Sequence, residues 1–226
     1  MGNLRKDYVS ERFVIVNQSE SQKTKTKKNP YKAGNETMTN PSVLSLVQKD
    51  GMLQRLQDDE GDCVKNWSVR VFPATDPSVT IDTDNSYTDH PLYSEPAYGY
   101  HYIISASPDE KETLSTLDVE QWGYVLSVVQ DRLRWMYTQK GVAYVAIYGN
   151  HGKEARSKVD HPHLHMMSFS IIPPKIEEEA NFSHKILNEN GVYTMSQLIN
   201  SETSRPRQIL QPETFIAISP WAPTYD

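Results

Sequence analysis

The strongest helical pattern in this chain, residues 117–139, restricts the folds that it can adopt. Its apolar residues recur mostly at intervals of three and four, which places them on one side of a helix. Thr116 or Asp118 can cap the start of the helix, and Gly141 follows its end. Because such an apolar stripe must be buried against another element, we expect this helix to pack on a sheet.

Short runs of β-branched and aromatic residues provide candidate strands for that sheet. These runs predict strands at 12–17, 67–72, 100–105, 142–148, 161–172 and 214–218. Two segments have weakly helical patterns, at 41–56 and at the polar residues 175–204, and the acidic residues 58–62 are typical of a turn. Strands combined with one long helix predict an α+β fold with a mainly antiparallel sheet.

Composition excludes several classes of protein. The chain has 226 residues and a net charge of −6, so it lacks the excess of Lys and Arg that nucleic-acid binding requires. No run of about 18 apolar residues is present, so we expect no membrane span. The single cysteine, Cys63, cannot form an internal disulfide, and the chain opens without a secretory signal. We therefore expect a cytoplasmic protein.

Three histidines, His161, His163 and His165, alternate along one predicted strand. Residues two apart on a strand project from the same face, so the pattern predicts three imidazoles in a row. Two functions fit such a row. The imidazoles could bind a metal ion, or one could attack a phosphorus atom while its neighbours orient it or contact phosphate oxygens.

The loop before these histidines favours phosphate chemistry. It offers Gly152 for close backbone approach, the hydroxyl of Ser157, and the cations Lys153, Arg156 and Lys158. Fixed cations and backbone N–H groups stabilise charge on a phosphoryl group during transfer. A nucleophile that follows a cationic loop therefore predicts a nucleotide phosphate site.

The sequence here resembles a known family. His161-Pro162-His163, following Asn150 and Gly152, resembles the galactose-1-phosphate uridylyltransferases, a branch of the histidine-triad (HIT) superfamily. Further similar segments are an opening strand at 4–16, a Gly-Asn-Glu motif within 29–36, Val-Arg-Val-Phe-Pro at 69–73 and Ser-Pro-Asp at 107–109. The resemblance implies a half-barrel of the HIT type built on an antiparallel sheet.

The same resemblance implies roles for individual residues. His163 would form a covalent nucleotidyl intermediate, His161 would orient its neighbours, and Asn150 would support the α-phosphate or the histidine loop. The substrate would be a nucleotide or nucleotide-sugar, and a homodimer is expected because family members are often dimers. The backbone carbonyl of His161 or Pro162 would hold the reactive tautomer of His163 if it faced the other ring nitrogen.

Departures from the family pattern change three expectations. Four family zinc positions are occupied here by Asn29, Lys32, Glu110 and His161, so we expect no zinc and no other cofactor. Lys32 is instead expected to place its ammonium where the metal would stand. His165 replaces a glutamine, so it could protonate a leaving group or contact a phosphate oxygen.

The replacement of glutamine by His165 favours hydrolysis or phosphorolysis over sugar exchange. The alternatives to a nucleotidyltransferase or phosphorylase are therefore a nucleotide hydrolase, a nucleotide-binding protein without turnover, and a metal-binding protein. Residues 212–223 resemble the first strand of the family's second half. We accordingly expect one HIT-like half over 1–210 and the start of a second over 211–226.

Overall fold

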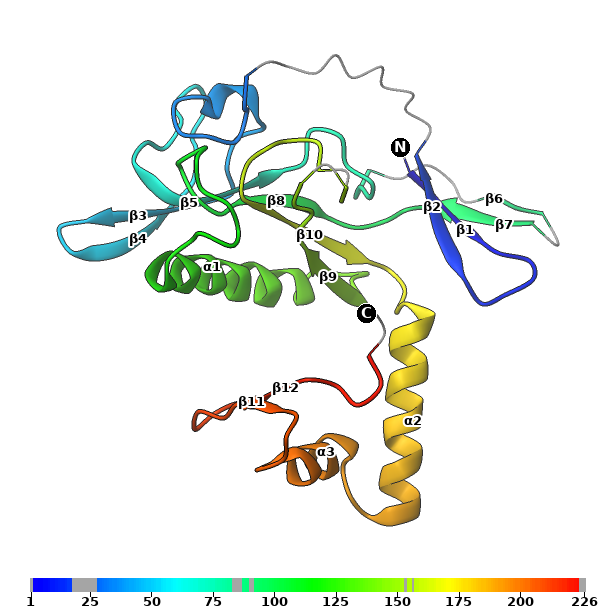
Figure 1. Ribbon diagram of the computed structural model, residues 1–226. Coiled ribbons are helices and arrows are strands. Elements are labelled where there is room, and N and C mark those ends of the chain that lie inside the picture. Colours follow the sequence, from blue (N-terminus) through cyan, green and yellow to red (C-terminus); the bar gives the residue numbers. More distant parts are fainter. Residues whose placement is uncertain are drawn as a thin grey trace. The chain divides into compact units, whose positions relative to one another are not determined.

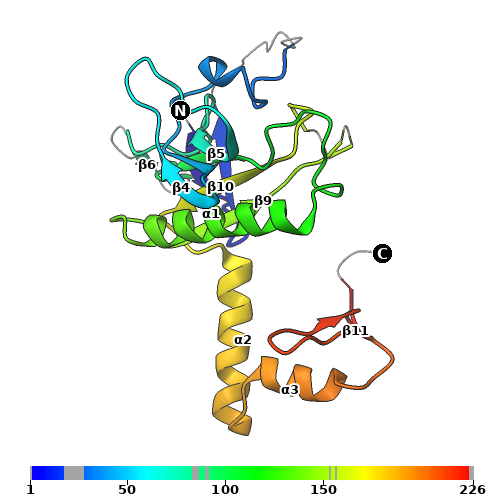
Figure 2. The ribbon, with the colours of Figure 1, turned by 90° about the vertical axis from the view of Figure 1, so that its left-hand side faces the viewer.

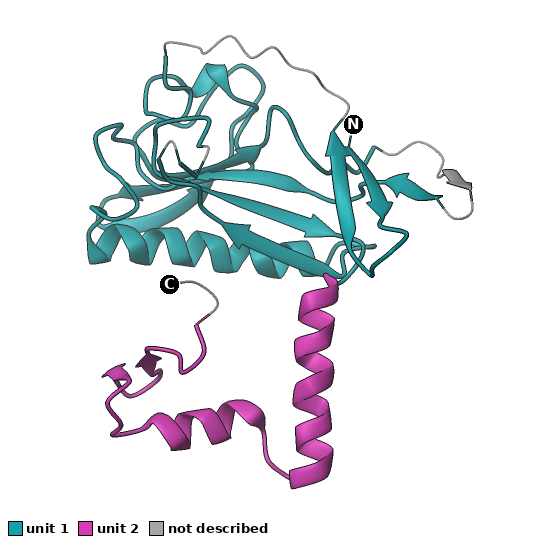
Figure 3. Cartoon of the chain, turned by 45° about the vertical axis from the view of Figure 1, so that its right-hand side comes forward, with its two compact units in different colours: residues 1–172 teal, residues 173–226 magenta. Residues whose placement is uncertain are grey.

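The computed structural model describes residues 2–17, 28–82, 87–89, 92–152, 154–155 and 157–223. The chain divides into two compact units, residues 1–172 and 173–226 (Figure 3). The first unit contains the two larger sheets and the long helix, and the second contains two helices and a short two-stranded sheet.

A six-stranded antiparallel sheet is the centre of the first unit (Figure 1). Its strand order is β4-β3-β5-β8-β10-β9. In that order the strands span Met52–Leu56, Leu44–Lys49, Trp67–Pro73, His101–Ser105, His163–Phe169 and Tyr144–Tyr148. The strands predicted at 67–72, 100–105, 142–148 and 161–172 are confirmed, and so is the α+β fold with a mainly antiparallel sheet.

Helix α1, Val119–Tyr137, packs along one face of this sheet, as the apolar stripe predicted (Figure 2). Asp118 caps the helix, because its side chain accepts a hydrogen bond of 2.7 Å from the backbone N–H of Gln121. Buried residues of the helix and the sheet form one apolar core, which includes Val125, Val128, Met136, Val71, Ile104 and Met166. This face of the sheet is therefore an apolar interface with α1.

The prediction of a weak helix at 41–56 is wrong, because this segment is the β3–β4 hairpin. Asp50 and Gly51 form its turn, with φ angles of 52° and 75°. Two successive residues with positive φ match the twist of a two-residue hairpin, and Asp-Gly is a favoured pair at such a turn. The signal was present in the sequence, but the weak helical spacing obscured it.

A second antiparallel sheet has the order β2-β1-β7-β6. These strands span Phe13–Asn17, Gly2–Lys6, Leu92–Pro96 and Tyr87–Asp89. The strand predicted at 12–17 is confirmed as β2, but the single opening strand implied for 4–16 is a hairpin of β1 and β2. Asp7 starts the turn by accepting a hydrogen bond of 2.7 Å from the backbone N–H of Val9, which reverses the chain.

The second unit contains α2, Pro174–Asn190, and α3, Thr194–Glu202, so the weak helical pattern at 175–204 is confirmed. Gly191 ends α2 in the left-handed conformation with a φ of 70°. A two-stranded sheet follows, β11 at Gln208–Leu210 and β12 at Ala217–Ile218. The boundary between the two compact units lies between residues 172 and 173. The boundary expected from the family resemblance, between a HIT-like half at 1–210 and the start of a second at 211–226, stays a prediction. Over the described ranges, no helix has the length and apolar character to cross a bilayer.

Candidate active site

Strand pairing places His163 and His165 on the sheet face opposite α1. In the β10–β8 register His163 lies across from Ser105 and His165 across from Ile103, while Tyr148 on β9 also pairs with His165. Side chains alternate along a strand, and the intervening Leu164 packs against the core under α1. The sheet therefore separates an apolar face from a face that carries histidines.

His163 is held in the tautomer that nucleophilic attack requires. Its Nδ1 lies 2.7 Å from the backbone carbonyl oxygen of His161. A carbonyl oxygen only accepts hydrogen bonds, so Nδ1 carries the proton and Nε2 keeps a lone pair. Burial lowers the pKa of His163, which favours the neutral ring. Among the described residues, Nε2 has no hydrogen-bond partner.

The His163 ring is nevertheless only 3% exposed. The Tyr31 ring makes an edge-to-face contact with the His163 ring, with centroids 5.1 Å apart. The ring of His165, two residues further along β10, lies 5.2 Å from the His163 ring between centroids. His163 is therefore largely enclosed, and a substrate has only a narrow approach to its ring. Tyr31 is the covering ring in direct contact.

His161 lies before the start of β10, so the predicted row of three imidazoles is reduced to two on the strand. Its ring is fixed at both nitrogens. Nε2 lies 2.8 Å from the carbonyl oxygen of Ser107, so it donates, and Nδ1 accepts from the Asn29 amide at 3.0 Å. Burial lowers the pKa of His161 to about 4. His161 thus acts on His163 through its backbone carbonyl, while its own ring anchors the loop.

His165 contacts a fourth histidine that sequence reasoning did not select. Its Nδ1 lies 3.0 Å from Nε2 of His101 on β8. Its ring also stacks on Tyr148, with centroids 5.0 Å apart and planes at 11°. His101 stood within a predicted strand, but nothing in a single sequence tells which strand lies beside the histidine strand. The contact spans 64 positions in the chain.

The segment that covers the histidines, residues 29–39, is anchored by two buried carboxylates. Glu36 accepts from Lys65 at 2.7 Å, and it also accepts from the backbone N–H of Gly34 and from the Trp67 indole. Asp58 forms a buried ion pair of 2.7 Å with Arg70, whose guanidinium also donates to Thr39. These residues hold Tyr31 and Asn29 over the site, although the sequence pattern assigned neither carboxylate a role.

The loop predicted to bind phosphate approaches His163 through Gly149, where an added Cβ would lie 3.5 Å from the His163 carbonyl oxygen. Asn150 follows, half-buried, with no hydrogen bond to another described residue. Gly152 has a φ of 79°, and its carbonyl oxygen accepts from the Ser157 backbone N–H at 3.1 Å. The Ser157 hydroxyl donates to the carbonyl of Val159, so it shapes the loop.

Lys158 is the cation that the structure places near the histidines. Its side chain is 75% exposed, and its ammonium lies 3.8 Å from Asp76. After burial and the neighbouring histidines, Lys158 is a further cause of the lowered pKa of His165. The other two predicted cations of the loop, Lys153 and Arg156, lie outside the described residues.

The four family zinc positions hold groups that do not fit a zinc ion. The ammonium of Lys32 pairs with the carboxylate of Glu110 at 2.9 Å, and the Asn29 amide donates to His161. Zinc requires electron-pair donors such as thiolate or neutral imidazole, but Lys32 is a cation and both nitrogens of His161 are engaged.

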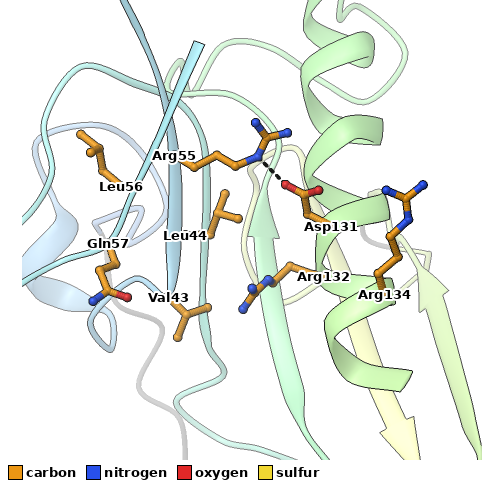
Figure 4. Close-up of a pocket in the computed structure, with 8 residues that line it drawn as sticks. All are labelled: Val43, Leu44, Arg55, Leu56, Gln57, Asp131, Arg132 and Arg134. Atoms are coloured by element: carbon orange, nitrogen blue, oxygen red, sulfur yellow. Dashed lines mark hydrogen bonds and ion pairs between the residues drawn. The ribbon is translucent and has the colours of Figure 1, made fainter. Parts of the chain in front are cut away.

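A pocket of about 420 Å³ lies elsewhere, beside α1 (Figure 4). Arg55 and Asp131 form an ion pair across it. Its lining includes Leu44, which belongs to the core on the α1 side of the sheet. This pocket shares no residue with the histidine face, so we do not assign it to the candidate active site.

Comparison with known proteins gives the same family as the residue pattern. Residues 6–173 match the family described as galactose-1-phosphate uridyl transferase, N-terminal domain. A galactose-1-phosphate uridylyltransferase from Thermotoga maritima is 24% identical over 131 residues. That alignment covers 58% of this chain and 41% of the relative, so the chain spans less than half of that protein.

Two solved structures share the fold. A uridylyltransferase matches with a TM-score of 0.76 at 19% identity, covering 96% of this chain and 60% of its own. An ADP-glucose phosphorylase from Arabidopsis thaliana with bound ADP-glucose matches with a TM-score of 0.65 at 19% identity, covering 96% and 63%. The match over residues 6–173 shows that the chain belongs to the galactose-1-phosphate uridyl transferase family.

Proposed function

We propose that this chain transfers a nucleoside monophosphate through a covalent intermediate on His163. The observation that carries the proposal is the 2.7 Å contact between His163 Nδ1 and the His161 carbonyl oxygen, which leaves the Nε2 lone pair for attack. In the first displacement, Nε2 would bond to the α-phosphorus and the leaving oxygen would take the electron pair of the broken P–O bond. An acceptor would then attack the phosphorus and release His163.

The proposed substrates are nucleotide-sugars or dinucleoside polyphosphates. The names of the relatives support nucleotide-sugars, since one is a uridylyltransferase and another is an ADP-glucose phosphorylase. The acceptor is a sugar phosphate, inorganic phosphate or water. Lys158, Arg156, Ser157 and the backbone at Asn150 and Gly152 are proposed to contact the phosphates.

Three further expectations belong to this proposal. The enzyme works without zinc, because Lys32 and Glu110 pair with each other at positions where the family has ligands. It is expected to act in the cytoplasm, which agrees with its one cysteine, Cys63. It is also expected to form a homodimer, on the resemblance alone.

A second candidate function is nucleotide binding without turnover. The 3% exposure of His163 favours it, because a largely enclosed ring leaves little room for the approach of a substrate phosphorus. The two functions predict different products. Binding alone retains the nucleotide without a bond to the protein, whereas transfer leaves a nucleotidyl group on His163.

The deciding experiment is incubation of the full chain with ADP-glucose, UDP-glucose or a diadenosine polyphosphate, followed by intact-mass spectrometry. Wild-type protein is expected to gain the mass of one nucleoside monophosphate in an acid-labile bond. His163→Ala should lose this labelling, and His184→Ala, an exposed histidine on α2, should retain it. Labelling of folded His163→Ala, or no labelling of folded wild type by any of these nucleotides, would refute the proposal.

A further inference from the structure

Ser78, His101 and His165 form a chain of hydrogen bonds that ends beside the proposed nucleophile. The backbone N–H of Ser78 donates to Nδ1 of His101 at 3.2 Å, and Nε2 of His101 lies 3.0 Å from Nδ1 of His165. His101 is buried on β8, and the covalent step proposed above does not use it. A buried pair of imidazoles therefore needs another explanation.

The amide at the start of the chain determines where each proton lies. A backbone N–H can only donate, so Nδ1 of His101 accepts and carries no proton. A neutral imidazole has one N–H group, so Nε2 of His101 carries it and donates to His165. Nδ1 of His165 is then an acceptor, and the His165 proton lies on Nε2.

Both rings are neutral at pH 7, which the proton assignment requires. Burial lowers the pKa of His101 and of His165 to about 4 in each case. The nearby charges are Asp76, which opposes this shift at His101, and Lys158, which adds to it at both rings. Neither charge outweighs burial.

The backbone that carries Ser78 is fixed on its far side. Thr80 donates to the carbonyl of Ala97 at 3.0 Å and accepts from the backbone N–H of Gly99 at 3.2 Å. Gly99 itself approaches β10 so closely that a Cβ would lie 2.0 Å from the Ser168 carbonyl oxygen. The amide of Ser78 is therefore a preorganised donor that does not depend on a flexible side chain.

We infer that His101 is a positioning residue that holds His165 as an Nε2–H donor, so that His165 binds a phosphate oxygen instead of protonating the leaving group. The inference rests on the proposed function, because His163 is the attacking ring in that proposal. The centroids of the His165 and His163 rings are 5.2 Å apart, so the Nε2–H donor of His165 lies beside the nucleophile. Within the described residues, Nε2 of His165 has no hydrogen-bond partner. Stacking on Tyr148 fixes the plane of the ring.

This arrangement specifies a class of substrate. When the bond between His163 Nε2 and phosphorus forms, the bridging P–O bond breaks and its oxygen leaves with the electron pair. A phosphate leaving group is stable as that anion and needs no proton, whereas an alcohol or amine needs a general acid. The site therefore favours phosphoanhydrides over nucleoside phosphodiesters and phosphoramidates.

The proton position can be measured without substrate. Proton–nitrogen correlation spectra of the full chain labelled with ¹⁵N-histidine distinguish the two tautomers, and His165→Gln identifies the His165 signals by their loss. We expect the Nε2–H form of His165 in wild type. His101→Gln, whose amide can still donate at the same place, should preserve it, and His101→Asn, one methylene shorter, should yield a mixture.

The rate of His163 labelling by ADP-glucose tests the consequence. His101→Asn should slow labelling about tenfold or more, and His101→Gln should recover most of the rate, because a hydrogen bond to a charged oxygen is lost only in the former. In the His165→Gln background, His101→Asn should have no further effect. ADP-glucose should also label faster than adenosine 5′-phosphoramidate.

Three results would overturn the inference. The first is the Nδ1–H form of His165 in wild type, and the second is equal labelling rates for His101→Asn and His101→Gln. The third is a His101→Asn substitution that slows labelling as much in the His165→Gln background as it does in wild type. Circular dichroism of each variant verifies folding. If no nucleotide labels wild-type His163, the proposed function fails by itself, and the spectra still decide whether His101 determines the tautomer of His165.

Discussion

Glu36 is the residue whose replacement tests most directly how the cover over the histidines is held. Its carboxylate is 3% exposed and accepts hydrogen bonds from Lys65 at 2.7 Å, from the Gly34 backbone at 3.0 Å and from Trp67 at 3.1 Å. Glu36→Gln keeps the shape and removes the charge. The amide NH₂ of the glutamine would then face the Lys65 ammonium. Both groups are donors, so no hydrogen bond can form between them.

The magnitude follows from the pKa of Glu36. Burial by itself raises this pKa, but the donors from Lys65, Gly34 and Trp67 outweigh burial and lower it from 4.5 to about 2. A difference of about two and a half units corresponds to about 3 kcal/mol, at about 1.4 kcal/mol per unit. Because the folded pKa is depressed, this stabilisation is present above about pH 4.5 and is lost as the pH falls towards 2.

The assay is urea unfolding followed by tryptophan fluorescence at pH 7 and pH 3. Glu36→Gln should lower the free energy of unfolding by about 3 kcal/mol at pH 7 and by clearly less at pH 3. Glu178→Gln, an exposed position on α2, serves as the matched control and should change it by less than about 0.5 kcal/mol. A loss for Glu36→Gln below about 1 kcal/mol at pH 7, or one that is equal at both pH values, would show that the charge does not anchor the cover.

Two further predictions concern the histidines and the zinc positions. His161 and His165 should titrate near pH 4 in proton NMR, because burial opposes their charged forms, and midpoints above pH 6 would contradict the burial argument. Exhaustive dialysis against a chelator should leave both the melting temperature and His163 labelling unchanged, since Lys32 and Glu110 pair without a metal. One tightly held zinc per chain in metal analysis would refute this prediction.

Local pattern was sufficient for the elements with a strong period. The apolar stripe predicted α1 and the face that it buries, and the β-branched runs predicted the central strands. Local pattern was insufficient at residues 41–56, where a weak helical spacing competed with an Asp50-Gly51 turn signal. This segment forms a hairpin around that turn. A hairpin becomes stable there because Leu44 and Leu46 are buried against the rest of the sheet.

The candidate site divides in the same way. Alternation along one strand predicted that His163 and His165 share a face, and the tautomer chemistry of imidazole indicated that a backbone carbonyl would hold His163. Neither could identify His101 or Tyr31 as neighbours, since these contacts join segments more than 60 residues apart.

The sequence by itself thus determined the residue types for the proposed phosphorus chemistry, their order along one strand, and the helix that covers the opposite face. Only the tertiary structure decided which nitrogen of His101, His161 and His165 carries a proton, because that depends on partners from segments distant in the chain. It also decided that Glu36 and Asp58 hold the cover, since a carboxylate is buried only when separate segments bring donors to it.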